Sequence, residues 1–326
     1  MSRYYPGFLG AFFLVLLRIA IGWHFLNEGW EKVNATQKGK EPFSAEIYLR
    51  NANGPFASFF RDMLPDASGL ALLDPDRLKA AWKDDVTRLQ AHYQFTAEQL
   101  AQAQTILDEN DRWADFWFAD PENAEKREKY FHDLHQVEQT EGDPEALSYQ
   151  KERAWESRRS LDADRRSLTG PLIEREKALR DAVAKLATPD QIKTSGVGGS
   201  PRTSLDLLNN LTMYGLIAIG FCLMAGFLTP LAALSAVAFL AMIYLSMPPW
   251  PGLPPNPKAE GHYWIVSKNL IELIACLVIA TTPSGHWIGL DALFFGARRR
   301  RRLARAAQEL GHEARHDRPR TPASGS

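Results

Sequence analysis

The chain consists of long apolar runs that flank a strongly charged middle. Apolar residues are concentrated in 7–27, 207–247 and 265–282, whereas 35–205 is rich in charge. About 18 mostly apolar residues are enough to cross a bilayer core of roughly 30 Å. The run at 207–247 is about twice that length, so the GFLTP sequence inside it is expected to form a turn. The pattern therefore predicts four membrane spans, at about 7–27, 207–227, 230–247 and 265–283.

The charged middle, 35–204, is expected to be a helical insert between the first and second spans. Apolar residues recur there at three- and four-residue spacing among charges. Asp74 and Asp120 are each followed by proline, which is typical of a helix start. Thr96 and Gln99 fit a capping box. We expect four tryptophans to build a small core in this insert: Trp82, Trp113, Trp117 and Trp155.

The predicted fold class is all-α, an integral membrane four-helix bundle with an extracytoplasmic helical insert, as a hairpin or small bundle. Basic residues that flank a span stay in the cytoplasm, and Arg298–Arg302 follow the last apolar run. We therefore expect a multi-pass protein of the inner (cytoplasmic) membrane with both termini inside and 35–204 outside. A signal peptide in place of the first span, or a nucleic-acid patch in the arginine run, explains the sequence less well. The expected divisions are 1–34, 35–204, 205–296 and a basic tail at 297–326.

The overall composition does not alter the prediction of membrane spans. A chain of 326 residues with a net charge of −1 and a mean hydropathy of −0.28 would pass for an ordinary soluble protein, because the charged insert offsets the apolar spans. The two cysteines, Cys222 and Cys276, lie inside predicted spans and are expected to be packing residues, with a disulfide as the alternative. Nothing in 35–205 resembles a metal-ligand or nucleotide motif, so no metal site is predicted.

Candidate chemistry lies in the polar residues of the first and fourth spans. Charged groups in hydrocarbon cost several kcal/mol each and normally face the interior of a helix bundle. Arg18 is expected near mid-depth and Glu272 about 10 Å from the outer surface, and an arginine side chain can reach several ångströms outward along its helix, so the two are expected to form a buried pair. Five further residues are expected to line a pocket that opens outward and binds a quinone: His24, Glu28, Lys32, Lys268 and Asn269.

Two alternatives remain open for these residues. In the first, Lys268 and Glu272 form only an intrahelical ion pair while Arg18 locks two helices together. Gly22 and Gly29 would then let those helices approach closely. In the second, His24 and His262 ligate a haem near the outer face. Neither alternative assigns a catalytic residue. No cofactor is evident from the sequence, and quinone is the one that we favour.

The same residues carry a family resemblance. The pattern Arg18, Gly22, Phe25, Gly29 and Lys32 resembles the opening of the DoxX/DoxD family. The hairpin GFCLMAGFLTPLAAL, the Lys268–Asn269 start of the fourth span and the closing SGHWIGLDALFFG with Asp291 resemble it as well. The resemblance covers about 1–34 and 205–296, and the long insert departs from the compact family pattern.

The resemblance implies a small four-helix membrane protein associated with redox chemistry. DoxD-like members are linked to a thiosulfate:quinone oxidoreductase, and DoxX-like members to membrane redox complexes. The expected function is thus a quinone-linked membrane subunit of an oxidoreductase complex, with a redox partner outside the cytoplasmic membrane and no nucleic acid. The alternative is a non-enzymatic anchor or scaffold that presents the insert to a partner. A transporter is less favoured, because no span shows the Gly/Pro interruption of a broken-helix site.

Overall fold

The computed structural model of this protein describes residues 7–39, 42–199, 203–254 and 264–294. Every regular element within these ranges is a helix, which confirms the all-α prediction. Two predictions fall outside the described residues: His262 as a haem ligand, and the arginine run of the 297–326 tail. The chain forms two compact units, and each unit has a hydrophobic core of its own.

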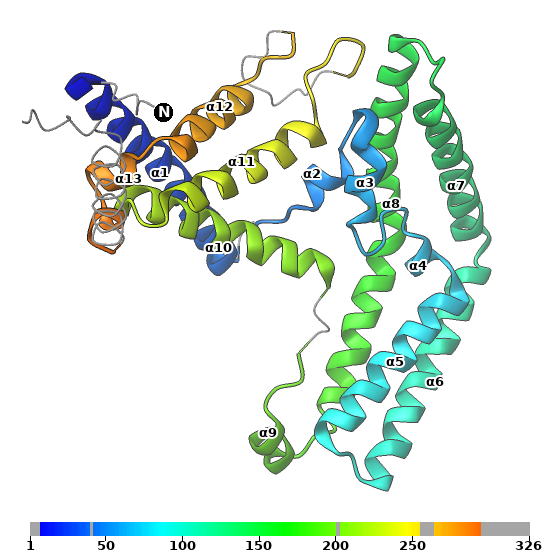
Figure 1. The fold of residues 1–326 in the computed structure, drawn as a ribbon. Helices are drawn as coiled ribbons and strands as arrows, with labels where there is room; N and C mark the ends of the chain where they lie inside the picture. The colour runs from blue at the N-terminus through cyan, green and yellow to red at the C-terminus, as the bar shows by residue number, and fades with distance from the viewer. Residues whose placement is uncertain (1–6, 40–41, 200–202, 255–263, 295–326) are drawn as a thin grey trace, which may run out of the picture. The chain divides into compact units, whose positions relative to one another are not determined.

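The first unit is built from apolar helices (Figure 1). It comprises the described parts of 1–43, 209–244 and 266–326. Three of its helices are long and apolar enough, by length and composition, to cross a membrane. These are α1 (Gly7–Lys38), α10 (Ser204–Ala225) and α11 (Thr229–Ser246), and the shorter helices are α12 (Lys268–Thr281) and α13 (Ser284–Trp287).

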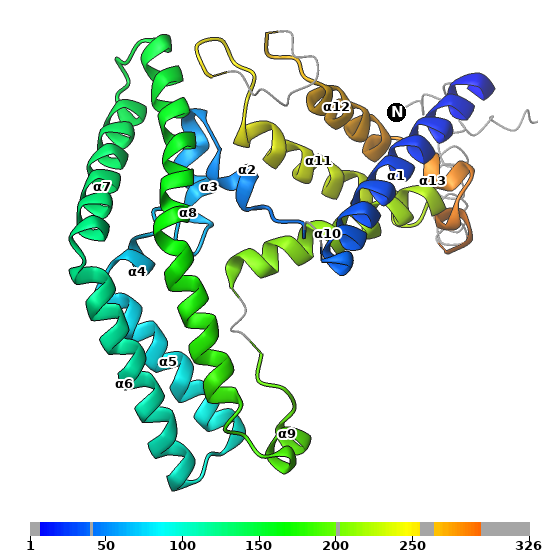
Figure 2. The same ribbon diagram turned by 180° about the vertical axis from the view of Figure 1, so that it is seen from behind.

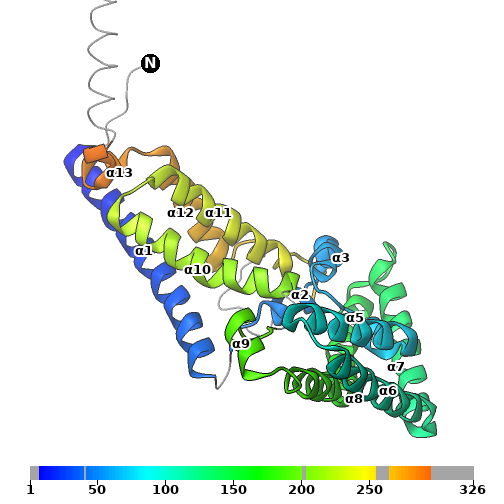
Figure 3. The same ribbon diagram turned by 90° about the horizontal axis from the view of Figure 1, so that it is seen from below.

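Helices α1, α10, α11 and α12 lie together in Figure 3. The core of the first unit draws buried side chains from all four of them. Glycines bring two of these helices into close contact, because a Cβ on Gly22 would lie 2.8 Å from the backbone nitrogen of Met224. Gly29 meets Ile217 in the same way. The close approach expected of these two glycines is therefore present. The buried core residues are Ile21, Phe25, Leu216, Leu223, Ala232, Ala233, Ala236, Leu240, Cys276 and Ile279.

The fourth predicted span is shorter than expected. Ser267 caps the start of α12 by accepting a hydrogen bond from the backbone N–H of Leu270, and Pro283 follows the end of the helix. The 14 residues of α12 extend about 21 Å, whereas a bilayer core is roughly 30 Å thick. The predicted four-span bundle consequently remains a prediction.

The second unit comprises the described parts of 44–208 and 245–265, and four long helices form most of it (Figure 2). α7 and α8 run side by side. The long helices are α5 (Pro75–Tyr93), α6 (Ala97–Ala119), α7 (Pro121–Gly142) and α8 (Ser148–Ala184). The short ones are α2 (Glu46–Arg50), η1 (Gly54–Phe56), α3 (Ala57–Asp62), α4 (Leu70–Leu73) and α9 (Pro189–Ser195).

Local signals set the boundaries of these helices. Asp74 accepts hydrogen bonds from the backbone of α5, and Asp120 accepts them from the backbone of α7. The capping box of Thr96 and Gln99 is formed at the start of α6. Trp82 is fully buried between α5–α8, so it supports the expected core. Trp113 and Trp117 pack against that core, whereas Trp155 is buried and donates a hydrogen bond to the backbone oxygen of Asn51 at 3.1 Å.

Candidate functional site

An imidazole and a carboxylate meet between α1 and α12. Nδ1 of His24 lies 2.8 Å from Oε1 of Glu272. The helical period puts Glu272 one turn before Cys276, which is buried in the core of the first unit. The carboxylate is therefore mostly shielded from solvent. It needs a hydrogen-bond donor in place of water, and His24 supplies one. His24 itself remains largely exposed, so a ligand can reach its ring.

A second ionic pair lies two turns further along α1. Nζ of Lys32 donates a hydrogen bond to Oε2 of Glu28 at 2.5 Å, the i, i+4 arrangement of a helix surface. Lys32 also lies over the ring of Phe43, 5.6 Å from its centroid. These two contacts hold the side chain of Lys32 in place.

The first turn of α12 adds a further positive charge. Lys268 lies close enough for its charge to act on both His24 and Glu28. Asn269 follows it and is partly buried. The residues expected to line a pocket are thus gathered at the start of α12 and the facing part of α1. We refer to the four ionisable ones, together with Glu272, as the polar array: His24, Glu28, Lys32, Lys268 and Glu272.

Arg18 does not pair with Glu272, and this prediction was wrong. Nη2 of Arg18 donates a hydrogen bond to the backbone oxygen of Ile288 at 2.7 Å, and Glu272 pairs with His24 instead. Arg18 precedes His24 by six residues, or about 9 Å of helix. Side chains on a helix tilt toward its N-terminus, so the guanidinium points further away from Glu272 rather than toward it.

Arg18 joins a different group of buried polar residues at the turn between α10 and α11. The carboxylate of Asp291 accepts hydrogen bonds from the backbone N–H groups of Leu228 at 2.7 Å and Thr229 at 3.0 Å. Its own N–H donates to the oxygen of Gly226 at 2.8 Å. Gly226 has a φ of +64° and leaves room for Arg18, whose Nη1 would lie 2.8 Å from a Cβ there. These contacts connect α1, the turn between α10 and α11, and the residues that follow α13. We call the five residues involved the Arg18–Asp291 cluster: Arg18, Gly226, Thr229, Ile288 and Asp291.

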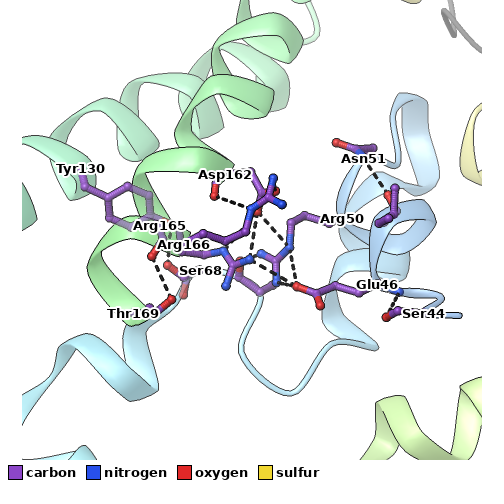
Figure 4. Close-up of polar contacts among 12 residues, drawn as sticks. Ser44, Glu46, Arg50, Asn51, Ser68, Tyr130, Asp162, Arg165, Arg166 and Thr169 are labelled. Atoms are coloured by element: carbon purple, nitrogen blue, oxygen red, sulfur yellow. Dashed lines mark hydrogen bonds and ion pairs between the residues drawn. The ribbon is translucent and has the colours of Figure 1, made fainter. Parts of the chain in front are cut away.

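The second unit contains an ionic network that was not predicted from the sequence (Figure 4). Nη2 of Arg165 lies 3.3 Å from the Glu46 carboxylate and 3.0 Å from that of Asp162. Arg50 bonds the same Glu46 at 2.8 Å. The i, i+4 spacing of Glu46 and Arg50 was a visible signal, but nothing in the sequence linked either residue to α8.

The network encloses little space. Its arginines, with Tyr130, line a cavity of about 20 Å³, which suits a single water molecule rather than an organic substrate. Burial raises the pKa of Tyr130 to about 12, and its hydroxyl donates a hydrogen bond to the backbone oxygen of Ser68 at 2.7 Å. The network therefore has the character of a structural element, and the polar array is the better candidate for chemistry.

Both cysteines are free thiols, which favours the packing interpretation over a disulfide. Within the described residues, no group of three His, Cys, Asp or Glu side chains is arranged to hold a metal ion. No protein-family model matches this chain, and neither a curated protein nor a solved structure matches it.

Proposed function

We propose that this chain is a DoxX/DoxD-type subunit of an oxidoreductase complex in the inner membrane and that it binds a quinone at the polar array. In this proposal α12 completes a fourth span, both termini are cytoplasmic, and 35–204 faces a redox partner outside. The observation that carries the proposal is the hydrogen-bonded pair of His24 and Glu272 between two apolar helices.

The pair has the chemistry that quinone reduction requires. A quinone that accepts an electron pair takes up a proton on each oxygen, so its site needs hydrogen-bond donors and a route for protons. His24 presents an exposed ring, and Glu272 orients that ring from behind. Lys268 adds positive charge beside the ring, which stabilises negative charge that develops on a carbonyl oxygen.

Quinone binding provides the test. The full chain, reconstituted in nanodiscs, is titrated with a short-chain ubiquinone, and affinity is followed by fluorescence quenching. We expect Glu272→Gln to weaken binding about tenfold, because the loss of a charge-assisted hydrogen bond costs about 1.4 kcal/mol or more. Glu31→Gln is the matched control: it removes a carboxylate of α1 that lies outside the polar array and has Asn27 as its partner.

A second test measures the rate of quinone reduction in membranes. Thiosulfate-dependent quinone reduction should fall about a hundredfold in membranes that carry Glu272→Gln at wild-type abundance. Wild-type protein that binds no quinone, or a variant with full turnover, contradicts the proposal.

The second candidate function is that of a scaffold that presents α5–α8 to a partner. The observation in its favour is the separate hydrophobic core of that four-helix bundle. Replacing 70–199 by a short Gly/Ser linker distinguishes the two. A redox subunit should retain quinone binding in the shortened chain, whereas a scaffold should lose its biological role altogether.

A further inference from the structure

The short helices α2 and α3 pack against the ends of two candidate membrane spans. Leu49 and Phe60 are buried in a cluster that also contains Leu205 from the start of α10 and Leu245 from the end of α11. The backbone N–H of Asn53 donates to the oxygen of Ser246 at 2.9 Å. The hydroxyl of Ser204 donates to the oxygen of Met63 at 3.2 Å. We call residues 46–62 the α2–α3 segment.

The lengths of the two spans fix the depth of this segment. α10 has 22 residues and extends about 33 Å, and α11 has 18 residues and extends about 27 Å. A hydrocarbon core of roughly 30 Å leaves neither helix much length to spare. Their ends must lie at the edge of the hydrocarbon. The α2–α3 segment contacts those ends, so it lies within a side chain's length of the lipid headgroups.

Large apolar side chains of the segment are exposed. A water-facing surface normally carries such residues singly, whereas a membrane–water interface is enriched in aromatic rings. The α2–α3 segment has four within 13 positions, and two of them are phenylalanines. They are Ile47 at 62%, Tyr48 at 50%, Phe56 at 42% and Phe59 at 53% exposed.

The two arginines of the same segment point the other way. The side chains of Arg50 and Arg61 are 12% and 13% exposed. Arg50 joins the network around Glu46 and Asp162 (Figure 4), and Nη1 of Arg61 binds Glu141 on α7 at 2.6 Å. Burial, and then the charge of Arg158, lower the pKa of Arg61 below its usual value. A surface that faces water normally exposes its arginines and buries its aromatic rings. This segment has the opposite arrangement.

We propose that the α2–α3 segment lies in the membrane interface, with Ile47, Tyr48, Phe56 and Phe59 inserted among lipid headgroups and the upper acyl chains. The partner of this surface is the lipid bilayer itself. Short helices with one apolar face are suited to this position, since insertion removes apolar area from water while the backbone hydrogen bonds stay satisfied. The proposal does not depend on quinone binding.

A fluorescent label distinguishes lipid from water at this position. In the full chain with Cys222→Ala and Cys276→Ala, Phe59→Cys is labelled with nitrobenzoxadiazole and reconstituted in nanodiscs. Phe116→Cys is the matched control, because Phe116 is a still more exposed phenylalanine on α6, outside the cluster that holds the α2–α3 segment. We expect lipid-borne nitroxide to quench the label at 59 severalfold more than the label at 116, and aqueous iodide to do the reverse.

Two outcomes overturn the proposal. Equal iodide quenching at the two positions would place residue 59 in water. A label at 59 that is shielded from both quenchers would mean that protein covers the segment. Tyr48→Cys gives the same readout, with the same expectation, if Phe59→Cys fails to accumulate.

Discussion

Arg18 and Asp291 put opposite charges into an apolar part of the molecule, and Arg18 is 1% exposed. A buried charge is tolerated when hydrogen bonds replace those of water. Asp291 satisfies this through the backbone N–H groups of Leu228 and Thr229, as an N-terminal helix cap would. Arg18 makes a hydrogen bond to the oxygen of Ile288 and lies near the Asp291 charge. These residues lock helices together, which is the structural role that the sequence left open for Arg18.

Because of Tyr130, we expect the stability of the second unit to fall at alkaline pH. Its pKa is raised from 10 to about 12 by burial, so the folded state favours the protonated phenol. This contribution is complete below the unfolded pKa of about 10 and is lost as the pH rises to about 12, amounting to about 3 kcal/mol. We expect urea midpoints to fall across that range in wild-type protein and to fall less in Tyr130→Phe.

The exposed Tyr149 on α8 supplies the control for this measurement. Tyr149→Phe should leave the wild-type pH profile unchanged, because its ring is half in solvent. Parallel profiles for wild type and Tyr130→Phe between pH 10 and 12 would contradict the assignment.

At the scale of elements, glycines decide how closely α1 and α10 pack. A Cβ on Gly220 would overlap the backbone of Leu26 and the oxygen of Gly22, and backbone atoms cannot move aside as a flexible side chain can. Gly220→Ala must therefore push the two helices apart. Overpacking of this kind typically costs about 1–3 kcal/mol.

Thermal unfolding in detergent micelles measures this cost. Gly215→Ala is the matched control on the same helix, since a Cβ there meets no atom within 4 Å. We expect Gly220→Ala to lower the melting temperature and Gly215→Ala to leave it unchanged or raise it slightly, because alanine favours a helix over glycine. Equal melting temperatures for the two variants would mean that α1 and α10 are not in close contact.

The sequence predicted those elements whose causes are local. Asp74, Asp120 and Thr96 mark helix starts because each caps the turn that follows it. The partners of Arg18 and Arg165 could not be predicted in this way, because they lie 270 and 119 residues away. The predicted Arg18–Glu272 pair failed for a more specific reason: it required the arginine side chain to reach outward along α1, whereas side chains of a helix tilt toward its N-terminus.

At the scale of the whole molecule, each of the two units has its own core. Trp82 is fully buried among α5–α8, and no residue of the core shared by α1, α10, α11 and α12 contributes to its cluster. We therefore expect Trp82→Ala to destabilise the second unit by about 3–5 kcal/mol and to leave the first unit unaffected.

Urea titration in micelles, followed by circular dichroism, separates the two units. The midpoint of the second unit should fall in Trp82→Ala while the helicity of the apolar helices persists to higher urea. Phe116→Ala, which truncates an exposed ring on α6, should leave both transitions in place. A single transition that shifts as a whole would contradict the independence of the two cores.

The partners within the Arg18–Asp291 cluster are far apart in the sequence, and this separation determines when their contacts can form during translation. Arg18 is synthesised long before Ile288, which follows it by 270 residues. The carbonyl of Ile288 accepts the hydrogen bond of Arg18. The N–H groups of Leu228 and Thr229, at the start of α11, likewise precede their Asp291 acceptor by 63 and 62 residues. During translation the nascent chain must carry an unneutralised guanidinium and an uncapped helix start until its closing segment emerges. The contacts of Arg18 and of the start of α11 can therefore form only after the segment that contains Ile288 and Asp291 has been synthesised.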